Sequence, residues 1–294
     1  MKVLLTGRDG QLGAALTATL PQGVELIATG RADLDLADPQ ACRHAVTTHR
    51  PDWVLNAGAY TAVDRAESEA ALAMAVNAGA PAAFAAALAE VGGRLLQVST
   101  DFVFDGTQGS PYSEDAPRNP LGVYGASKAE GELAALALPE GRVLRTSWVY
   151  GPVGRNFCLT MLRLHAARAA AGEELAVVAD QVGCPTATHT LAMACWQALQ
   201  LTDGAPRLLH WSDAGAASWY DFAVAIGELG VALGLLKQAA QVKPITTADY
   251  STPARRPAYS LLACADSRRS LGLQPCHWRT ALAGVLRQVA AQAT

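Results

Sequence analysis

Short apolar runs alternate with helical stretches through the first half of the chain. The runs have apolar residues at consecutive positions, which is typical of strands buried on both faces of a parallel sheet. They lie at residues 2–6, 24–29, 53–56, 94–99 and 143–147. Helical spacing fills the intervals at residues 11–20, 39–49, 67–91 and 123–137, with a break expected at residues 79–81. With right-handed crossovers, this order predicts an α/β fold, a doubly wound parallel sheet of the Rossmann type.

The pattern is looser after residue 150. It predicts helices at residues 156–171, 188–201, 218–229 and 278–292, strands at 175–179 and 207–211, and a long loop at 237–260. We interpret residues 1–150, with a returning segment at roughly 175–212, as one domain. Residues from roughly 151–174 and 213–294 then form a smaller, interleaved C-terminal lobe.

Composition and charge exclude several classes of protein. The chain has 294 residues, of which 51% are hydrophobic and 17% charged, so disorder is excluded. A net charge of −3 provides no basic field for nucleic acid or an anionic membrane. The apolar stretch at 70–91 contains Asn77, Pro81 and Glu90 and predicts a packed helix instead of a membrane span. The six cysteines are scattered, which predicts reduced thiols and a cytoplasmic protein.

A glycine motif follows the first predicted strand and opens the first predicted helix. Gly7, Gly10 and Gly13 are spaced G-x-x-G-x-x-G, with Gln11 and Leu12 between the last two. Glycines let the backbone approach a pyrophosphate, and the helix N-terminus points free N–H groups at it. The motif predicts a dinucleotide-binding turn; the alternative is a purely structural turn.

The end of the second strand bears on cofactor choice. An acid there favours NAD, whereas an arginine favours the 2′-phosphate of NADP. The strand ends at Arg31, and the first acid is Asp33, so we expect NADPH, with NADH possible. Arg8 is a second candidate for the phosphate, and a solvated loop charge is the alternative for Arg31. Asp35 and Leu36 are placed to flank the adenine.

Tyr124 and Lys128 are four residues apart and share one face of a predicted helix. A nearby ammonium stabilises a phenolate, so Lys128 is expected to lower the pKa of Tyr124. The fourth strand ends near Thr100. Because ligands bind beyond the carboxyl ends of parallel strands, Thr100, the Tyr124–Lys128 pair and the glycine turn are expected at one edge of the sheet.

This combination resembles the extended branch of the short-chain dehydrogenase/reductases. Further segments resemble, within that branch, the family of dTDP-4-dehydrorhamnose reductases, and the resemblance covers essentially the whole chain. The most specific segments are Asn56-Ala57-Gly58-Ala59-Tyr60-Thr61-Ala62-Val63-Asp64-Arg65-Ala66-Glu67 and Val98-Ser99-Thr100-Asp101-Phe102-Val103-Phe104-Asp105-Gly106.

The resemblance implies that NADPH reduces the C4 ketone of a dTDP-linked 4-keto-6-deoxy sugar, giving dTDP-L-rhamnose. Tyr124 would donate the proton, Lys128 would hold the nicotinamide ribose, and Thr100 would bond the carbonyl oxygen. The implied cofactor contacts are Gly7, Gly10, Gln11, Leu12, Gly13, Arg31, Asp35, Leu36, Asn56, Ala57, Gly58, Tyr60, Ser99, Tyr124 and Lys128. The implied substrate contacts are Thr61, Val63, Thr100, Phe102, Trp148 and Arg256. Residues 1–150 would thus bind the dinucleotide, and the smaller lobe the substrate.

Several of these residues have structural alternatives. Trp148 is either a wall for a sugar ring or a core residue, and Arg256 contacts either the diphosphate or a neighbouring loop. Asp101 and Asp105 are expected to shape their loop. Asp64 and Glu67 have the spacing of a capping box. Trp219 and Tyr220 are expected in a helix core, and Asn77 either bonds backbone within its helix or serves the site.

The chain departs from the family pattern at four positions. Phe102 stands where tyrosine is common, and Tyr259 where asparagine is usual. Some members join subunits through carboxylate-bound magnesium, but Ala15 and His189 occupy two such positions. Without these oxygen ligands we expect no metal, and a monomer or a weak homodimer.

Two other functions compete with the reductase. A nucleotide-sugar epimerase or epimerase/reductase would need an added acid–base residue, such as cysteine or histidine, near the catalytic tyrosine. No such residue occurs in residues 99–106 or beside Tyr124. A non-catalytic, cofactor-binding regulator would have no need of Tyr124, Lys128 or the glycines, all of which are present.

Overall fold

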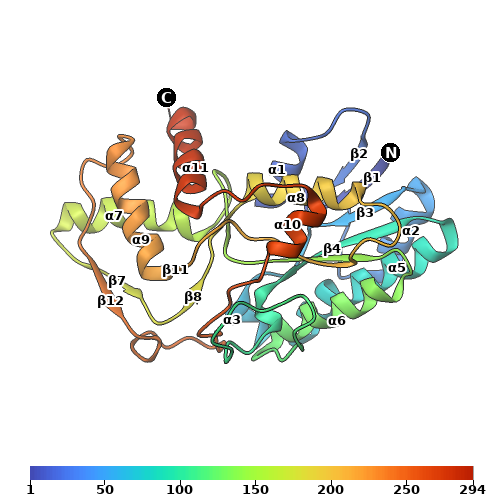
Figure 1. Cartoon of the computed structure of the whole chain (residues 1–294), viewed down its shortest axis with the longest axis horizontal. Helices are drawn as coiled ribbons and strands as arrows, with labels where there is room; N and C mark the ends of the chain where they lie inside the picture. Colours follow the sequence, from blue (N-terminus) through green and yellow to red (C-terminus); the bar gives the residue numbers. More distant parts are fainter. Residues whose placement is uncertain (294) are drawn as a thin grey trace.

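Six parallel strands form the sheet of the larger lobe, in the order β10-β5-β4-β3-β1-β2. The computed structural model describes residues 1–293. The strands are β1 (Lys2–Thr6), β2 (Glu25–Thr29), β3 (Trp53–Asn56), β4 (Arg94–Thr100), β5 (Arg142–Thr146) and β10 (Leu208–His210). The chain reverses its direction of winding at β1, which lies between β2 and β3. The predicted doubly wound parallel sheet is confirmed (Figure 1).

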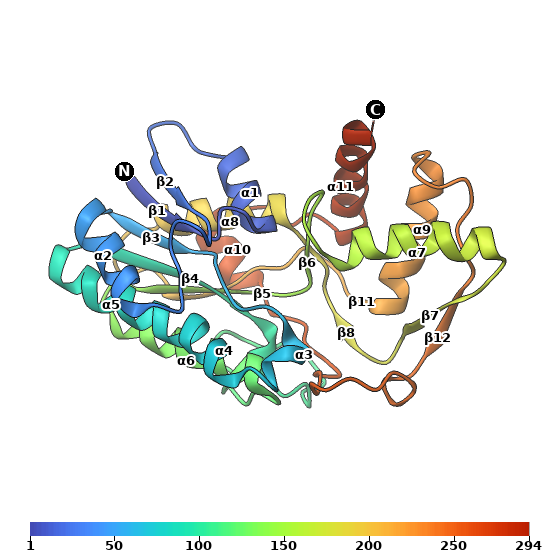
Figure 2. The same ribbon diagram turned by 180° about the vertical axis from the view of Figure 1, so that it is seen from behind.

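Helices cover both faces of this sheet (Figure 2). On one face, α1 (Gln11–Ala18) packs on α8 (Thr188–Gln200), and Leu16 and Trp196 are buried there against Leu5. On the other face lie α2 (Pro39–His49), α5 (Ala80–Val91) and α6 (Val123–Ala137). The strands β1, β3, β4 and β5 are buried because both of their faces are covered, as the continuous hydrophobic runs predicted, whereas the edge strand β2 is only partly buried.

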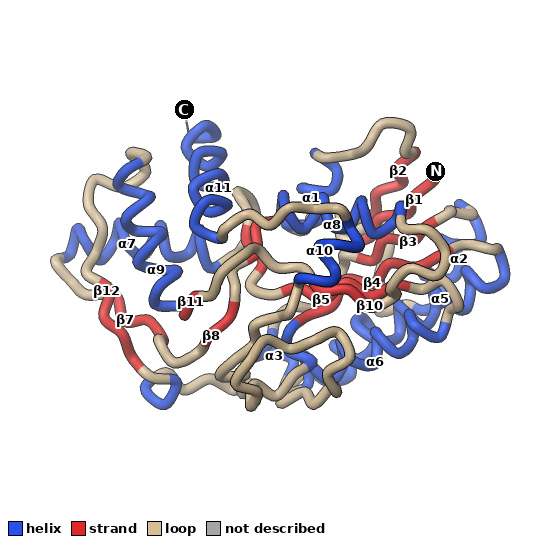
Figure 3. Tube along the Cα trace, viewed as in Figure 1, coloured by secondary structure: helices blue, strands red, loops and turns tan. Residues whose placement is uncertain are grey.

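The smaller lobe has its own core. It is built by α7 (Phe157–Ala171), α9 (Trp219–Ala232) and α11 (Trp278–Ala293), which lie together beside the larger lobe (Figure 3). Their apolar side chains pack around the buried Phe222. The strand β7 (Leu175–Val178) pairs with β12 (Val242–Ile245) in this lobe. The segment predicted to return to the larger lobe, roughly residues 175–212, therefore starts too early, since β7 belongs to the smaller lobe. Within this segment, α8 and β10 are the elements that join the larger lobe.

Other elements of the second half were missed or misplaced. The predicted loop at 237–260 contains β12 and a short 3₁₀ helix, Thr247–Asp249. A helix, α10 (Ala265–Leu271), was not predicted. Paired two-residue strands connect the lobes and were also missed: β6 (Val149–Tyr150) with β9 (Thr186–Ala187), and β8 (Val182–Gly183) with β11 (Ala217–Ser218).

The apolar stretch at residues 70–91 is one helix with an irregular turn. It consists of α4 (Ala70–Met74), a π-helical turn at Ala75–Gly79, and α5; a short helix, α3 (Val63–Ala66), precedes it. The predicted break at residues 79–81 is wrong, because the helix continues through them; the irregularity is the π-helical turn that ends at Gly79, two residues before Pro81. This helix is long and apolar enough to cross a membrane, but half of its apolar window is buried against the rest of the protein, as in a core helix.

Candidate active site

The glycine turn lies where β1 passes into α1, at the point where the winding reverses. Gly7 has a φ of +74°, and a Cβ there would lie 2.7 Å from the Cα of Gly58. A Cβ on Gly13 would lie 2.1 Å from the carbonyl oxygen of Gly7. Gly10 is the N-cap of α1 and supplies no side-chain cap. Exposed first-turn amides and close backbone packing form a cradle that fits a pyrophosphate.

The end of β2 carries a cluster of charges. Arg31 is exposed on the turn after the strand. Arg8 reaches further in: its guanidinium donates to the carbonyl of Ala28 at 3.0 Å and pairs with Asp33 at 3.0 Å. The Asp33 carboxylate also accepts from the amide of Gly30 at 2.8 Å, so it already has partners within the turn.

Residues predicted to flank or line the cofactor differ in their placement. The side chain of Leu36 lies against Gly58, where a Cβ would meet it at 2.6 Å, so it borders the cradle. Asp35 turns its carboxylate to the amide of Ala37, 2.9 Å away. The side chain of Asn56 is buried within the sheet, where it bonds Thr6 at 2.5 Å and Gln97 at 2.6 Å. Because this side chain is engaged within the sheet, the predicted cofactor contact at Asn56 is left to its backbone at the end of β3, and it stays a prediction.

Ser99 is likewise turned away from the edge of the sheet. Its hydroxyl donates to the Glu132 carboxylate of α6 at 2.6 Å and is buried. That carboxylate also receives Nε and Nη2 of Arg145 at 2.8 Å and 2.7 Å, and Arg118 at 3.2 Å. Ser99 is thus engaged in a buried ion-pair network that fixes α6 to β4 and β5. Sequence reasoning missed this network, because its charges come from separate elements.

Thr100, Tyr124 and Lys128 are brought together at the end of β4, as predicted. The Tyr124 side chain lies beside Thr100, and its ring packs edge-on against Phe102 with centroids 5.6 Å apart. Burial raises the pKa of Tyr124 to about 12, with the Thr100 hydroxyl acting in the opposite direction. The expected net lowering of this pKa is wrong, because burial of the phenol outweighs any stabilisation of the phenolate by Lys128. The Lys128 ammonium donates to the carbonyl of Val98 at 2.6 Å. Burial lowers the pKa of Lys128 to about 8.

Asp101 adds a buried acid to this group. It is 1% exposed, and its Oδ1 accepts the Thr100 hydroxyl at 3.0 Å, whereas its Oδ2 has no hydrogen-bond partner in the structure. Burial raises the pKa of this carboxyl to about 6. Asp105, by contrast, accepts from Thr107, Tyr112 and Asn119 and shapes its loop, as predicted.

The π-helical turn presents Asn77 to the site. Its side chain clamps the backbone of Tyr60, accepting from the amide at 2.9 Å and donating to the carbonyl at 3.0 Å. It also donates to the hydroxyl of Ser127 on α6 at 3.0 Å. Of the two alternatives, Asn77 therefore serves the site: it joins the segment after β3 to the helix that carries Tyr124 and Lys128.

The segment from Tyr60 to Glu69 is held by its acids. The Tyr60 hydroxyl donates to Glu69 at 2.5 Å, and Asp64 pairs with Arg256 at 2.9 Å. Glu67 accepts from the amide of Val123, the first residue of α6, at 2.9 Å. The predicted Asp64–Glu67 capping box is wrong, because α3 has Ala62 as its N-cap and Glu67 caps another helix.

This segment also carries two of the predicted substrate contacts, Thr61 and Val63, both of which precede α4. Thr61 is exposed and Val63 half-buried. Arg256, on the facing loop, is engaged by that neighbouring segment and holds the pKa of Asp64 below its usual range.

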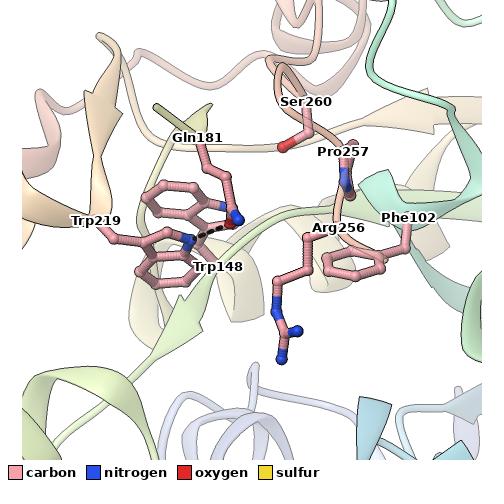
Figure 4. Close-up of a pocket in the computed structure, with 7 residues that line it drawn as sticks. All are labelled: Phe102, Trp148, Gln181, Trp219, Arg256, Pro257 and Ser260. Carbon is pink, nitrogen blue, oxygen red and sulfur yellow. Dashed lines mark hydrogen bonds between the residues drawn. The ribbon is translucent and has the colours of Figure 1, made fainter. Parts of the chain in front are cut away.

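Aromatic side chains from both lobes line a narrow cavity of about 10 Å³ (Figure 4). Trp148 and Trp219 stack with centroids 3.5 Å apart, and the Trp219 indole N–H donates to Gln181 at 3.2 Å. Both residues are partly buried and pack against the core of the smaller lobe, so Trp219 makes the expected core contact and also forms part of the cavity wall. Trp148 has a φ of +48°, a rare backbone conformation for a bulky residue and one that concentrates at functional sites. The complete lining is Phe102, Trp148, Gln181, Trp219, Arg256, Pro257 and Ser260.

A wider hollow of about 230 Å³ adjoins this cavity and shares Gln181 and Arg256 with it. Tyr250 and Arg255 lie along its rim and are exposed. The two lobes also meet at the glycine turn. There, the side-chain amide of Asn156 (Nδ2) donates to Oε1 of the Gln11 side chain at 2.8 Å. The predicted site residues of both lobes therefore face one region.

No group of three or more histidine, cysteine or acidic side chains with metal-site geometry occurs within residues 1–293. Ala15 lies on α1 and His189 is exposed on α8. The expected absence of a metal remains a prediction.

A doubly wound sheet, a glycine turn at its switch point and a Tyr–Lys pair beside a threonine define an NAD(P)-dependent oxidoreductase of the short-chain dehydrogenase/reductase class. Residues 1–291 match the family model described as the RmlD substrate binding domain. A dTDP-4-dehydrorhamnose reductase of Streptomyces griseus is 44% identical over 95% of this chain and 91% of its own. The chain belongs to this family, which confirms the resemblance seen in the sequence.

Solved structures agree with that assignment. A dTDP-4-dehydrorhamnose reductase of Clostridium acetobutylicum has a TM-score of 0.89 and 37% identity, covering 99% of this chain and 100% of its own. One from Bacillus anthracis, solved in complex with NADP, has a TM-score of 0.88 and 32% identity, covering 98% and 99%.

Proposed function

We propose that this protein reduces the C4 ketone of dTDP-4-dehydro-6-deoxy-L-mannose to dTDP-L-rhamnose, with NADPH as the reductant and Tyr124 as the proton donor. The observation that carries the proposal is the grouping of Tyr124, Lys128 and Thr100 at the end of β4. Membership of the reductase family and the names of its members support the substrate.

The residues around the glycine turn suit a dinucleotide. The backbone is packed so closely here that a Cβ would not fit at Gly7, Gly13 or Gly58. This close packing, with the first-turn amides of α1, suits a pyrophosphate. NADPH would supply the hydride when bound here. Arg8 and Arg31 would face the 2′-phosphate, and the complex of the Bacillus anthracis relative with NADP supports that choice. In this assignment the larger lobe holds the cofactor and the smaller lobe helps to hold the sugar nucleotide.

Three side chains of the protein, those of Tyr124, Thr100 and Lys128, would carry out the proton transfer to the ketone oxygen. With a pKa of about 12, Tyr124 carries its proton at neutral pH, which is the form a donor needs. The Thr100 hydroxyl would turn its proton from Asp101 to the ketone oxygen as negative charge develops there, and Tyr124 would deliver its proton to the same oxygen. The ammonium of Lys128, on the same face of α6, would stabilise the phenolate that remains.

The sugar nucleotide would lie between the lobes. The stacked indoles offer a flat apolar wall, and Arg256 is the cation at its edge. Phe102 brings an apolar ring where relatives commonly have a hydroxyl, so we expect its contact with the sugar to be apolar. Because the cavity is only about 10 Å³, Trp219 or Arg256 must shift before a sugar can enter.

The test measures NADPH oxidation with 4-keto-6-deoxy sugars linked to dTDP, UDP or GDP. We expect turnover of the dTDP-linked sugar, and a decrease in kcat of about 10²–10⁴ for Tyr124→Phe with unchanged affinity for NADPH. Tyr220→Phe on α9 is the matched control. Turnover of the Tyr124→Phe variant at the wild-type rate would refute the assignment of the donor.

Two controls address the competing functions. An epimerase would exchange sugar protons at C3 or C5 with deuterated water before reduction, and we expect no such exchange. A non-catalytic relative would bind NADPH but oxidise it with none of the sugars.

A further inference from the structure

The helix that carries the proposed proton donor has an unusual beginning. Gly122 is the N-cap of α6 and has no side chain to bond the free amides of the first turn. Serine, threonine, aspartate and asparagine usually fill this role. Here the cap comes from elsewhere in the sequence: Oε1 of Glu67 lies 2.9 Å from the amide nitrogen of Val123.

Gly122 and Glu67 fit one another. A Cβ on Gly122 would lie 2.5 Å from Oε1 of Glu67, closer than van der Waals contact allows. The backbone of Gly122 is extended, with φ of −153° and ψ of 177°, so glycine is not needed there for its conformation. A side chain at position 122 would instead have to displace the Glu67 carboxylate from its place beside the Val123 amide.

The capped amide is next to the chemistry. Val123 precedes Tyr124, and Lys128 follows one turn later on the same helix. Glu67 belongs to the segment that Asn77 clamps at Tyr60 and that Arg256 holds at Asp64. A negative carboxylate at a helix N-terminus also interacts favourably with the helix dipole.

We infer that Glu67 is a positioning residue for the proposed reduction: by capping α6 in place of Gly122, it sets the place of Tyr124 relative to Thr100. Glu67 itself does not touch the reacting atoms. The inference rests on the proposed function for its kinetic consequence, whereas the cap itself can be measured without turnover.

The experiment is a mutant cycle at Glu67 and Gly122. Glu67→Ala should lower kcat about tenfold, since a small misplacement of a catalytic group costs up to about 10²-fold, and should leave the affinity for NADPH unchanged. Glu67→Gln keeps an acceptor oxygen and should retain kcat within about threefold of wild type. Glu130→Ala, an exposed glutamate on the same helix, is the matched control.

In the second half of the cycle, Gly122→Ser is expected to have opposite effects on kcat in the wild-type and Glu67→Ala backgrounds. Gly122→Ser alone should lower kcat, because its side chain collides with Glu67. In the Glu67→Ala background the same Gly122→Ser should raise kcat, because serine then caps the helix in the space left behind. A merely destabilising role for Glu67 would not produce this reversal.

Hydrogen exchange of the amides at residues 123–126 provides a readout besides turnover. We expect faster exchange in Glu67→Ala and recovery in the double variant. If the wild type reduced none of the sugars while exchange followed this pattern, the proposed function would fail and the cap would stand. Unchanged exchange and kcat in Glu67→Ala would overturn the inference, and so would a double variant no better than Glu67→Ala.

Discussion

Two buried carboxylates lie near the end of β4, and their surroundings differ. Glu132 receives hydrogen bonds from Ser99, Arg118 and Arg145, and both of its oxygens are paired. Asp101 receives the Thr100 hydroxyl on one oxygen, and the other has no partner in the structure. Ser99 and Thr100 are consecutive, and because side chains alternate along a strand they serve opposite faces.

The difference separates structure from chemistry. A buried charge that is fully paired fixes its neighbours, which here are α6, β4 and β5. A buried charge that is half paired is costly to the fold, and such groups concentrate at functional sites. We therefore expect Glu132 to act as a scaffold residue and Asp101 to take part in the proposed site instead of only shaping its loop.

The largest effect is expected from breaking the paired region. Glu132→Gln removes the charge that balances Arg145, whose side chain is 1% exposed. Leaving a buried charge unpaired should lower the free energy of unfolding by about 3–5 kcal/mol. Urea denaturation measures it, with the exposed Glu130→Gln as the control. An unchanged midpoint would contradict the scaffold role.

The opposite sign is expected at Asp101. Its folded pKa of about 6 lies above the ordinary value of 3.8, so the charged form is disfavoured in the fold. The stability contributed by this group is thus full below pH 4 and is lost as the pH rises through 6. Asp101→Asn should therefore raise the free energy of unfolding at pH 7 by about 1–3 kcal/mol.

The same variant should lower kcat roughly tenfold, because the Asp101 carboxylate no longer orients the Thr100 hydroxyl before the ketone oxygen arrives. Thermal unfolding at pH 4 and pH 7, together with turnover, tests both parts. A variant less stable than wild type at pH 7 would show that Asp101, like Glu132, is structural.

A smaller effect comes from Lys128, between the two acids. Its pKa of about 8 means that the ammonium loses its proton as the pH rises through 8, while Tyr124 stays protonated. We expect kcat to fall on the alkaline side of pH 8. Lys128→Arg keeps the charge and should remove this limb from the pH profile; a limb unchanged in the variant would assign it to another group.

The smallest effect is expected where charge is exposed. Arg31→Ala should raise the KM for NADPH a few-fold, since solvent screens an exposed ion pair, and should leave that for NADH unchanged. Initial rates with both cofactors measure it. Equal changes for the two cofactors would show that Arg31 does not contact the 2′-phosphate.

Sequence patterns predicted those parts of the site whose residues are close together in the sequence. The glycine turn lies within seven residues, and Tyr124 and Lys128 lie on one helix, so spacing alone indicated both. The Glu132–Arg145 pair and the Glu67 cap depend on tertiary contacts between separate elements. The capping-box rule failed at Asp64 because it considers only neighbours in sequence.

The fold follows the same division. The strands of the larger lobe were recognised from continuous apolar runs, even the four-residue β3, whereas β12 is equally long and was missed because it contains Lys243 and Pro244 and is only partly buried. Trp219 was expected in a helix core because its spacing is the same whether an aromatic ring faces a core or a cavity. Burial against a second lobe has no signature in the sequence of one helix.

The π-helical turn at Ala75–Gly79 amounts to one residue too many in an otherwise regular helix. The surplus is local: the α-helical hydrogen bonds of Ala80–Val91 resume beyond it, and α5 keeps its packing against α2. A fold can acquire a polar contact in this way by insertion, without rebuilding either half of the helix. Deleting a single residue from the turn would restore regular winding and rotate Asn77 away from Tyr60. The number of residues in this helix therefore determines whether Asn77 can reach the backbone of Tyr60.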